Sequence, residues 1–430
     1  MADFLLTAMP FTGHVTPMTA ISAALVDRGH QVRFYTGSAF RDRVEATGAR
    51  FVPWRHAPDF DEQDLSATFP RLMGRKGLAQ LLANMEDLFI ATAPGQLADV
   101  RTEWRRRPWE VLVSEEVSYG PPLIAHALGC HWATVAILPL NLPSVQGPPP
   151  MGLRPGGGPL GRARDAALRG LTPLLTARLR APITRAAHEA GLHPPDTSFD
   201  RVVFSKELIL ASGVAALDHD RTDRPGWLHW VGRLAHPDTP PTRLPSWWDD
   251  LAGRRVIHVT QGTQNVDPTE LLRPALEALA NIDAIVVAST GVRGREALPF
   301  PVPANARVAS FLPYDQLLPR TELVVTNGGW GGVLATLAHG IPLVVGGGDL
   351  DKPEVAARVA SSGAGVNLRS GRPHPHRVRA AVERVRTDPG FAAAARRIAR
   401  QLGDAGGSAR AAQLLEAFAA QAEGRAQGPG

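Results

Sequence analysis

Strand-like and helix-like segments alternate along this 430-residue chain in two successive sets. The strands of the first set are expected at Phe4–Thr7, Gln31–Thr36, Val111–Ser114, Ala133–Leu138 and Glu207–Ala211. Those of the second set are expected at Arg255–Thr260, Ala284–Ser289, Val308–Phe311, Leu323–Thr326 and Leu343–Val345. Such alternation predicts parallel sheets covered by helices on both faces. The chain is also too long for one ordinary core, which indicates two domains.

A proline-rich stretch separates the two sets. Its prolines include Pro237, Pro240, Pro241 and Pro245, and proline favours an extended linker over a helix or a central strand. We therefore expect a first domain over residues 1–224, a linker over 225–245 and a second domain over 246–405. Residues 406–430 would form an amphipathic helix and a tail.

A glycine-rich unit stands out in the second set. The sequence LVVTNGGWGGVLATLAHGIPLVV, which begins at Leu323, has the order strand, turn, helix, strand. The first turn of such a helix offers unpaired N–H groups and a positive dipole end, which suit a diphosphate. Its glycines lack Cβ atoms and allow close approach. A glycine turn alone is common, but GGGDLDKP follows and places Asp351 and Lys352 at another strand end, where open α/β sheets bind ligands.

The unit resembles the donor-binding signature of family 1 glycosyltransferases, in their bacterial natural-product (antibiotic or macrolide) branch. Trp330 occupies the aromatic position of the signature, and GIP keeps its Gly-x-Pro. Asn327 replaces the usual histidine, and Lys352 follows Asp351 where glutamine is usual. The resemblance implies an α/β fold of the GT-B class, with two Rossmann-like parallel-sheet domains facing each other across a cleft. It also implies that the last helix crosses back to the first domain.

The resemblance places a nucleotide-sugar donor on the second domain. The donor-binding residues are expected to be Gly262, Thr263, Asn327, Gly329, Trp330, Gly331, Gly332, Val333, Asp351 and Lys352. Asp349-Leu350-Asp351 spells Asp-x-Asp, a metal–diphosphate motif of another glycosyltransferase fold, but three residues are a weak signal. Helix N–H groups can stabilise a leaving diphosphate in place of a cation. We expect no metal and no cofactor besides the co-substrate.

A histidine follows the first expected strand. Phe4–Thr7 is an apolar run, and MPFTGHVTPM places His14 in the loop at its carboxyl end. Pro17 is expected near the start of the next helix and Gly29 at its end. The catalytic histidine of the family matches His14.

A histidine base needs an acceptor on its other ring nitrogen, usually a carboxylate. The strand Val111–Ser114 ends in Glu115 and Glu116, and Glu115 stands where the family has an aspartate. Glu116 is an alternative, although neighbouring strand residues point to opposite faces. In another interpretation both glutamates merely cap the next helix.

Two irregular stretches, 55–77 and 139–161, are long for connections within a compact domain, so they are functional loops or mobile surface. The resemblance makes them walls of an acceptor pocket that faces a flat, apolar molecule. The acceptor-binding residues are expected to be Phe11, Phe60, Phe69, Met73 and Leu140.

Composition argues against several other classes. The net charge is +5, but the arginines are interleaved with acids, a pattern typical of solvated faces rather than of a nucleic-acid site. The single cysteine, Cys130, allows no intrachain disulfide and is typical of a reducing cytoplasm. The first residues lack a basic signal region, and no apolar run reaches the about 18 residues that span a bilayer. We expect a cytoplasmic protein without nucleic-acid or membrane partners.

We therefore expect an inverting, metal-independent glycosyltransferase, a monomer or homodimer, that moves a sugar from a TDP- or UDP-sugar to a hydroxyl of a small, largely apolar natural product. One alternative is a nucleotide-sugar 2-epimerase of the same fold, which needs no acceptor. Another is a non-catalytic partner of a glycosyltransferase, which the departures at Glu115 and Asn327 leave open. A dehydrogenase is disfavoured because the first turn lacks Gly-x-Gly-x-x-Gly.

Overall fold

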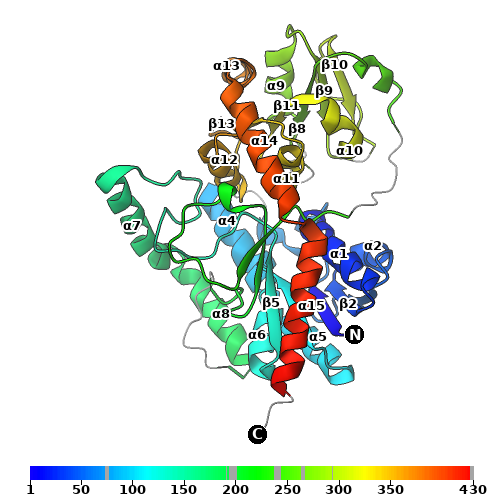
Figure 1. Cartoon of the computed structure of the whole chain (residues 1–430), viewed down its shortest axis with the longest axis vertical. Coiled ribbons are helices and arrows are strands. Elements are labelled where there is room, and N and C mark those ends of the chain that lie inside the picture. The colour runs from blue at the N-terminus through cyan, green and yellow to red at the C-terminus, as the bar shows by residue number, and fades with distance from the viewer. Residues whose placement is uncertain are drawn as a thin grey trace.

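The computed structural model describes residues 1–72, 77–189, 191–192, 201–236, 244–262, 267–292 and 294–426, which form two domains, each built on one parallel sheet (Figure 1). The first sheet has the order β3-β2-β1-β4-β5-β6-β7, and the second has the order β10-β9-β8-β11-β12-β13. Every pair of neighbouring strands within them is parallel. The expectation of two Rossmann-like parallel-sheet domains is confirmed.

The strands of the first sheet are β1 (Asp3–Thr7), β2 (Gln31–Thr36), β3 (Arg50–Pro53), β4 (Val111–Glu115), β5 (His131–Ala136), β6 (Ile209–Ser212) and β7 (Leu228–Gly232). Those of the second are β8 (Val256–Thr260), β9 (Ile285–Ser289), β10 (Ala306–Ala309), β11 (Thr321–Thr326), β12 (Leu343–Val345) and β13 (Gly365–Asn367). All ten expected strands are present. The sequence missed β3, β7 and β13, which lie at sheet edges, where mixed polar residues replace the continuous apolar run of a central strand.

The expected start of the linker is wrong. Strand β7 lies within 225–245 and pairs with β6, so the first sheet extends beyond residue 224. The sequence LHWVG was taken for linker because it lies within a stretch that is rich in proline. Pro237, Pro240 and Pro241 lie outside the described residues.

The helices of the first domain are α1 (Thr12–Asp27), α2 (Arg41–Glu45), α3 (Leu65–Thr68), α4 (Gly77–Asn84), α5 (Ala93–Arg106), α6 (Gly120–Leu128), α7 (Gly158–Leu175) and α8 (Ala177–Glu189). The later ones are α9 (Leu272–Leu279), α10 (Tyr314–Leu317), α11 (Trp330–Ala338), α12 (Lys352–Ser361), α13 (Pro375–Thr387), α14 (Pro389–Asp404) and α15 (Gly407–Ala426). The short 3-10 helices are η1 (Ser38–Phe40), η2 (Pro70–Leu72), η4 (Ala215–Leu217), η5 (Trp248–Leu251) and η6 (Leu318–Arg320), and η3 (Met85–Ile90) is a π-helix.

The last helix returns to the first domain. Figure 1 shows α14 on the second domain continuing into α15, which runs down the side of the first. Helix α15 packs against α1, β5 and β7, and Leu415 belongs to the same core cluster as Phe4 and Leu6 of β1. The chain end therefore helps to hold the two domains together.

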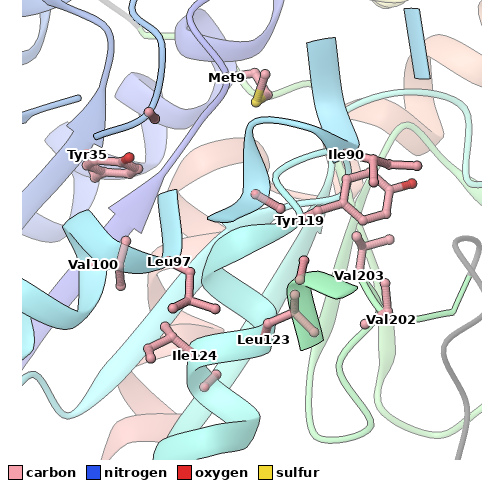
Figure 2. Packing of buried hydrophobic residues seen from close by; sticks show 14 of the residues in the cluster. Met9, Tyr35, Ile90, Leu97, Val100, Tyr119, Leu123, Ile124, Val202 and Val203 are labelled. Atoms are coloured by element: carbon pink, nitrogen blue, oxygen red, sulfur yellow. The ribbon is translucent and has the colours of Figure 1, made fainter. Parts of the chain in front are cut away.

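The first sheet has a core on each face, because successive strand residues point to opposite sides. Leu5 faces the cluster of α5 and α6, and Phe4 and Leu6 face that of α1 and α15. Figure 2 shows part of the first cluster, where Leu97 of α5 lies beside Ile124 of α6. These cores hold the ends of β1 and β4, from which the site is built.

Helix α1 starts earlier than expected. It begins at Thr12, so His14 lies in its first turn rather than in a loop, and Pro17 lies inside it. Gly29 follows the helix with a φ of +83°, as expected of a helix stop. Within the described residues, no helix combines the length and apolar character needed to cross a membrane.

Candidate active site

His14 and Glu115 meet at the carboxyl ends of two adjacent strands. Strands β1 and β4 pair with Thr7 opposite Ser114, so the residues that follow them are neighbours. The Nδ1 atom of His14 lies 3.2 Å from Oε2 of Glu115. The histidine–carboxylate pair expected from the sequence is thus assembled in space, although its two members are far apart in the chain.

The carboxyl group of Glu115 is fully buried and held by several donors. The backbone N–H of Met9 and the hydroxyl of Ser118 donate to Oε1 at 3.0 and 3.1 Å. The N–H of Val117 donates to Oε2 at 3.3 Å. Donors on both oxygens leave the carboxyl group of Glu115 little freedom to rotate. Glu115 can therefore orient the imidazole and stabilise its protonated form.

The protonation of His14 reflects two opposing effects. Burial acts to lower the pKa of the imidazole, but the carboxylate of Glu115 outweighs it and the net shift is upward from 6.5, with smaller contributions from Asp351 and Glu62. Asp351 comes from the second domain, so His14 experiences the charge of a group across the domain interface.

Glu116 takes a different role. Its Oε1 accepts a hydrogen bond of 2.8 Å from the N–H of Leu138, and its Oε2 is buried without a partner among the described residues. Burial raises its pKa well above the usual range, and the charge of Glu115 adds to this. Glu115, not Glu116, contacts His14, which decides between the two alternatives left by the sequence.

The glycine-rich turn after β11 leads into α11 as expected. Gly329 is the N-cap, and added Cβ atoms at Gly331 and Gly332 would meet no atom within 4 Å. The N–H groups of the first three helical residues have no partner within an α-helix. Val333 is different, because its N–H bonds to the carbonyl of Gly329 at 3.0 Å and its side chain is buried. Val333 was expected among the donor-binding residues, but its N–H group is used within the helix.

Asn327 connects the two glycine loops. Its Nδ2 donates to the carbonyl of Gln261, and its Oδ1 accepts from the N–H of Gly329 at 3.4 Å. Gly262 lies beside it, since a Cβ there would be 3.6 Å from the Asn327 amide. The structure thus brings Gly262 to the start of α11. One amide hydrogen of Asn327 is used in the bond to Gln261 and is not available to a ligand. Thr263 lies outside the described residues.

The side chain of Trp330 points into the domain interface. Its Nε1 donates to Ser212 at the end of β6, and its ring packs on Gly213, where a Cβ would lie 2.9 Å from the indole. The ring is buried in a cluster with Val214 and Leu217. This residue was expected to bind the donor, yet its side chain contacts the first domain, which leaves only its backbone N–H for a ligand.

Asp351 is the N-cap of α12 and is half-buried. Burial raises its pKa, against the opposing charges of Lys352 and His14. The ammonium group of Lys352 is buried 3.4 Å from Asp349. Between the aspartates, Leu350 has a φ of +58°, a strained conformation for a branched side chain and one that is enriched at functional sites.

Aromatic side chains surround His14 on the first domain. The ring centroid of Phe11 lies 5.3 Å from His14 and 5.1 Å from Phe60, which in turn lies 5.4 Å from Phe69. Leu140 belongs to the same buried cluster. Phe11 therefore lies beside the histidine, Phe60 and Phe69 extend from it in a chain of ring contacts, and Leu140 shares their core cluster. Met73 lies outside the described residues.

Two residues near His14 were missed. The ring of Phe89, on the π-helix η3, lies 6.3 Å from the imidazole and nearly parallel to it. Glu62 accepts a 2.8 Å bond from the N–H of Thr12 at the start of α1. Neither residue sits in a periodic pattern or motif. A π-helix, which is often found at functional sites, is not readable from sequence.

No group of three or more potential metal ligands occurs among the residues that the structure describes. Asp349 and Asp351 are separated by the turn at Leu350, and Asp349 is engaged by Lys352.

Comparisons with known proteins identify relatives of this chain. Residues 273–417 match the model of the family described as "Erythromycin biosynthesis protein CIII-like, C-terminal domain". The chain is 39% identical over 401 residues to 4'-demethylrebeccamycin synthase of Lentzea aerocolonigenes, covering 92% of this chain and 94% of that protein. It is 31% identical over 419 residues to UDP-glucosyltransferase B1 of Starmerella bombicola, covering 92% and 93%. The structure of the glycosyltransferase VinC in complex with dTDP superposes with a TM-score of 0.67 at 20% identity, over 97% of this chain and 100% of that one.

Proposed function

The chain belongs to the family 1 glycosyltransferases of the GT-B fold, and we propose that it transfers a sugar, with inversion at the anomeric carbon, from a TDP- or UDP-sugar to a hydroxyl of a small, largely apolar natural product. That it is a glycosyltransferase related to enzymes of antibiotic pathways follows from the family. The identity of the donor, the class of the acceptor and the inversion of configuration are what we propose.

The contact between His14 and Glu115 carries the mechanism. Because Glu115 takes Nδ1, the Nε2 atom remains to accept the proton of the acceptor hydroxyl. The buried carboxylate stabilises the imidazolium that results. The acceptor oxygen then attacks the anomeric carbon on the face opposite the departing nucleotide, so that a single displacement inverts the configuration.

The start of α11 supports the departure of the nucleotide without a metal. The open N–H groups of Trp330, Gly331 and Gly332 and the positive end of the helix dipole suit the charge that develops on a diphosphate. Asp351, at the start of α12, would accept hydrogen bonds from sugar hydroxyls.

Separate observations support the proposed donor and the proposed acceptor. One relative is named a UDP-glucosyltransferase, and one structural neighbour is described with dTDP bound. Another relative is named for a natural product. The aromatic cluster of Phe11, Phe60 and Phe69 beside His14 suits a flat, apolar acceptor.

The test begins with calorimetric titration of UDP, TDP and a panel of their glucose, rhamnose and amino-sugar conjugates. The donors that bind are incubated with hydroxylated polycyclic aromatics, with and without EDTA, and the anomeric configuration of the product is read by NMR. Transfer with inversion that survives EDTA supports the proposal. Retained configuration would exclude a single displacement, and epimerised donor formed without acceptor would favour the 2-epimerase alternative.

A further inference from the structure

Four charged side chains form a buried network where the two domains meet. Arg358 and Glu354 come from α12 in the second domain, and Asp218 and Arg221 follow η4 in the first. Arg358 is bound to Glu354 at 2.9 Å and to Asp218 at 2.8 Å, and Asp218 also binds Arg221 at 2.6 Å. The side chains of Arg358 and Asp218 are 2% and 3% exposed. Two positive and two negative charges balance here, as buried charges require.

The same network holds the wall expected for the acceptor. The carbonyl of Leu140 accepts a 2.7 Å bond from Nη2 of Arg358 and a 3.3 Å bond from Arg221. Arg221 also donates to the carbonyl of Leu142. Farther along the stretch 139–161, the N–H of Gly152 donates to Glu354 at 2.9 Å.

The wall and α12 are in direct contact at Gly152. This glycine has a φ of +76°, and a Cβ on it would lie 2.6 Å from the Cβ of Pro353 in the first turn of α12. Only a glycine fits there without displacing the helix. The stretch therefore docks on the turn of α12 that directly follows Asp351.

We propose that Arg358 is a positioning residue that fixes the acceptor wall, from Leu140 to Gly152, to helix α12, and so sets where the acceptor hydroxyl lies relative to the sugar. This inference rests on the proposed function, which gives Asp351 the sugar and Leu140 the acceptor side.

Geometry explains how a residue that touches neither substrate acts on transfer. Arg358 holds the backbone of Leu140, whose side chain packs in the cluster of Phe11, Phe60 and Phe69. Seven residues before Arg358, at the N-cap of α12, Asp351 lies close enough to His14 for its charge to raise the pKa of the imidazole. One guanidinium group thus ties the helix that carries the sugar ligand to the wall that confines the acceptor, and its planar fork sets direction as well as distance.

The first experiment needs no substrate. Amide hydrogen exchange is compared in wild type, Arg358→Met and Arg33→Met. Arg33 is a matched control: it is 3% exposed and binds two carboxylates, of Asp3 and Glu103, and two backbone carbonyls, but wholly within the first domain. The proposal expects faster exchange of the segment Leu140–Gly152 in Arg358→Met alone. Unchanged exchange there, or an equal increase in both variants, would overturn it.

The second experiment measures the partition between transfer and hydrolysis of the donor, using the donor–acceptor pair that the wild type accepts. In Arg358→Met, kcat/KM for the acceptor should fall about tenfold to a hundredfold, and the fraction of donor lost to water should rise, while calorimetric affinity for TDP and UDP stays at the wild-type value. Arg358→Lys keeps the positive charge but lacks the planar guanidinium group. Its kcat/KM for the acceptor and its fraction of hydrolysed donor should lie between those of wild type and Arg358→Met. Arg33→Met should change neither acceptor KM nor the partition.

The proposed function and the positioning role of Arg358 can be wrong independently of each other. If the wild type binds nucleotides but transfers to no acceptor, the proposed function is in error, and the exchange experiment still tests the link between Leu140 and α12. If the wild type transfers and Arg358→Met keeps the acceptor KM and partition of Arg33→Met, the positioning role is wrong and the function stands.

Discussion

The indole Nε1 of Trp330 donates a hydrogen bond of 2.9 Å to the hydroxyl oxygen of Ser212. Trp330 opens α11 in the second domain, and Ser212 closes β6 in the first. The helix whose N–H groups are proposed to face the diphosphate is therefore anchored at its first residue to the opposite domain. The anchor relates the donor side to the first domain independently of Arg358.

Ser212→Ala tests this anchor. The substitution leaves a buried indole N–H without an acceptor, which costs about 1–3 kcal/mol, and we expect a lower midpoint of urea unfolding and a weaker affinity for TDP or UDP. Trp330→Phe removes the N–H and keeps a ring. If this hydrogen bond stabilises the protein, the Ser212→Ala/Trp330→Phe double variant should lose less unfolding free energy than the two single variants lose together. Strictly additive losses would show that the two side chains act independently.

His14→Ala tests the base. Removing a positioned general base lowers turnover by about 10²–10⁴-fold, and we expect a fall of this size in kcat with the calorimetric affinity for TDP and UDP unchanged. Turnover within a few-fold of wild type would assign the proton transfer to another group.

The pH dependence of transfer follows from the raised pKa of His14. The base must be neutral to accept a proton, so kcat/KM should rise with pH through an apparent pKa above 6.5. Glu115→Gln removes the negative charge beside Nδ1, and the acid limb should then move to lower pH while the maximal rate falls. An acid limb that stays in place in Glu115→Gln would contradict the assignment of that limb to His14.

The lowered pKa of Glu354 predicts that the folded protein becomes less stable in acid. Burial acts to raise its pKa, but His219, Arg358 and the N–H of Gly152 outweigh it and lower the pKa to about 2. A depressed carboxyl pKa stabilises the fold above its unfolded value near 4.5, and this contribution, at most about 3 kcal/mol, is lost as pH falls toward 2. Urea unfolding midpoints of wild type and Glu354→Gln should therefore differ most at pH 6, differ by about half as much at pH 3, and converge only as the pH falls below about 2. A gap that does not narrow would refute the linkage.

Substitution of Phe89 should impair the use of the acceptor and leave the binding of the nucleotide-sugar donor unchanged. Its ring stacks on His14, so Phe89→Ala should lower kcat/KM for the acceptor about tenfold, equivalent to about 1.4 kcal/mol, with donor KM unchanged. Phe418→Ala is a matched control, because Phe418 is also half-buried and packs on a histidine, His131, but on α15 away from the site. Similar acceptor kinetics in both variants would exclude a role for Phe89 in acceptor binding.

Elements that depend on a local pattern of residues could be predicted before the fold was known. Central strands such as β1 and β11 are largely apolar runs because both their faces are buried, and the turn before α11 is marked by consecutive glycines between an apolar run and a helical pattern. His14 and Glu115 could be paired in advance because His14 follows one strand and Glu115 ends another, and the carboxyl ends of parallel strands share one edge of the sheet. Edge strands such as β7 escaped detection, since their half-exposed residues blur the apolar pattern.

Contacts between distant segments leave no local pattern, so they became visible only in the folded protein. The sequence predicts that Trp330 binds the nucleotide-sugar donor, yet its indole donates a hydrogen bond to Ser212, which lies 118 positions earlier. Arg358 lies 218 positions from Leu140, and nothing within an amphipathic helix pattern reveals that its guanidinium is buried against that carbonyl. A helical period shows which face of α12 is covered but not what covers it. The partner is set by the packing of two domains, and this is why the proposed link between sugar and acceptor became visible only in the fold.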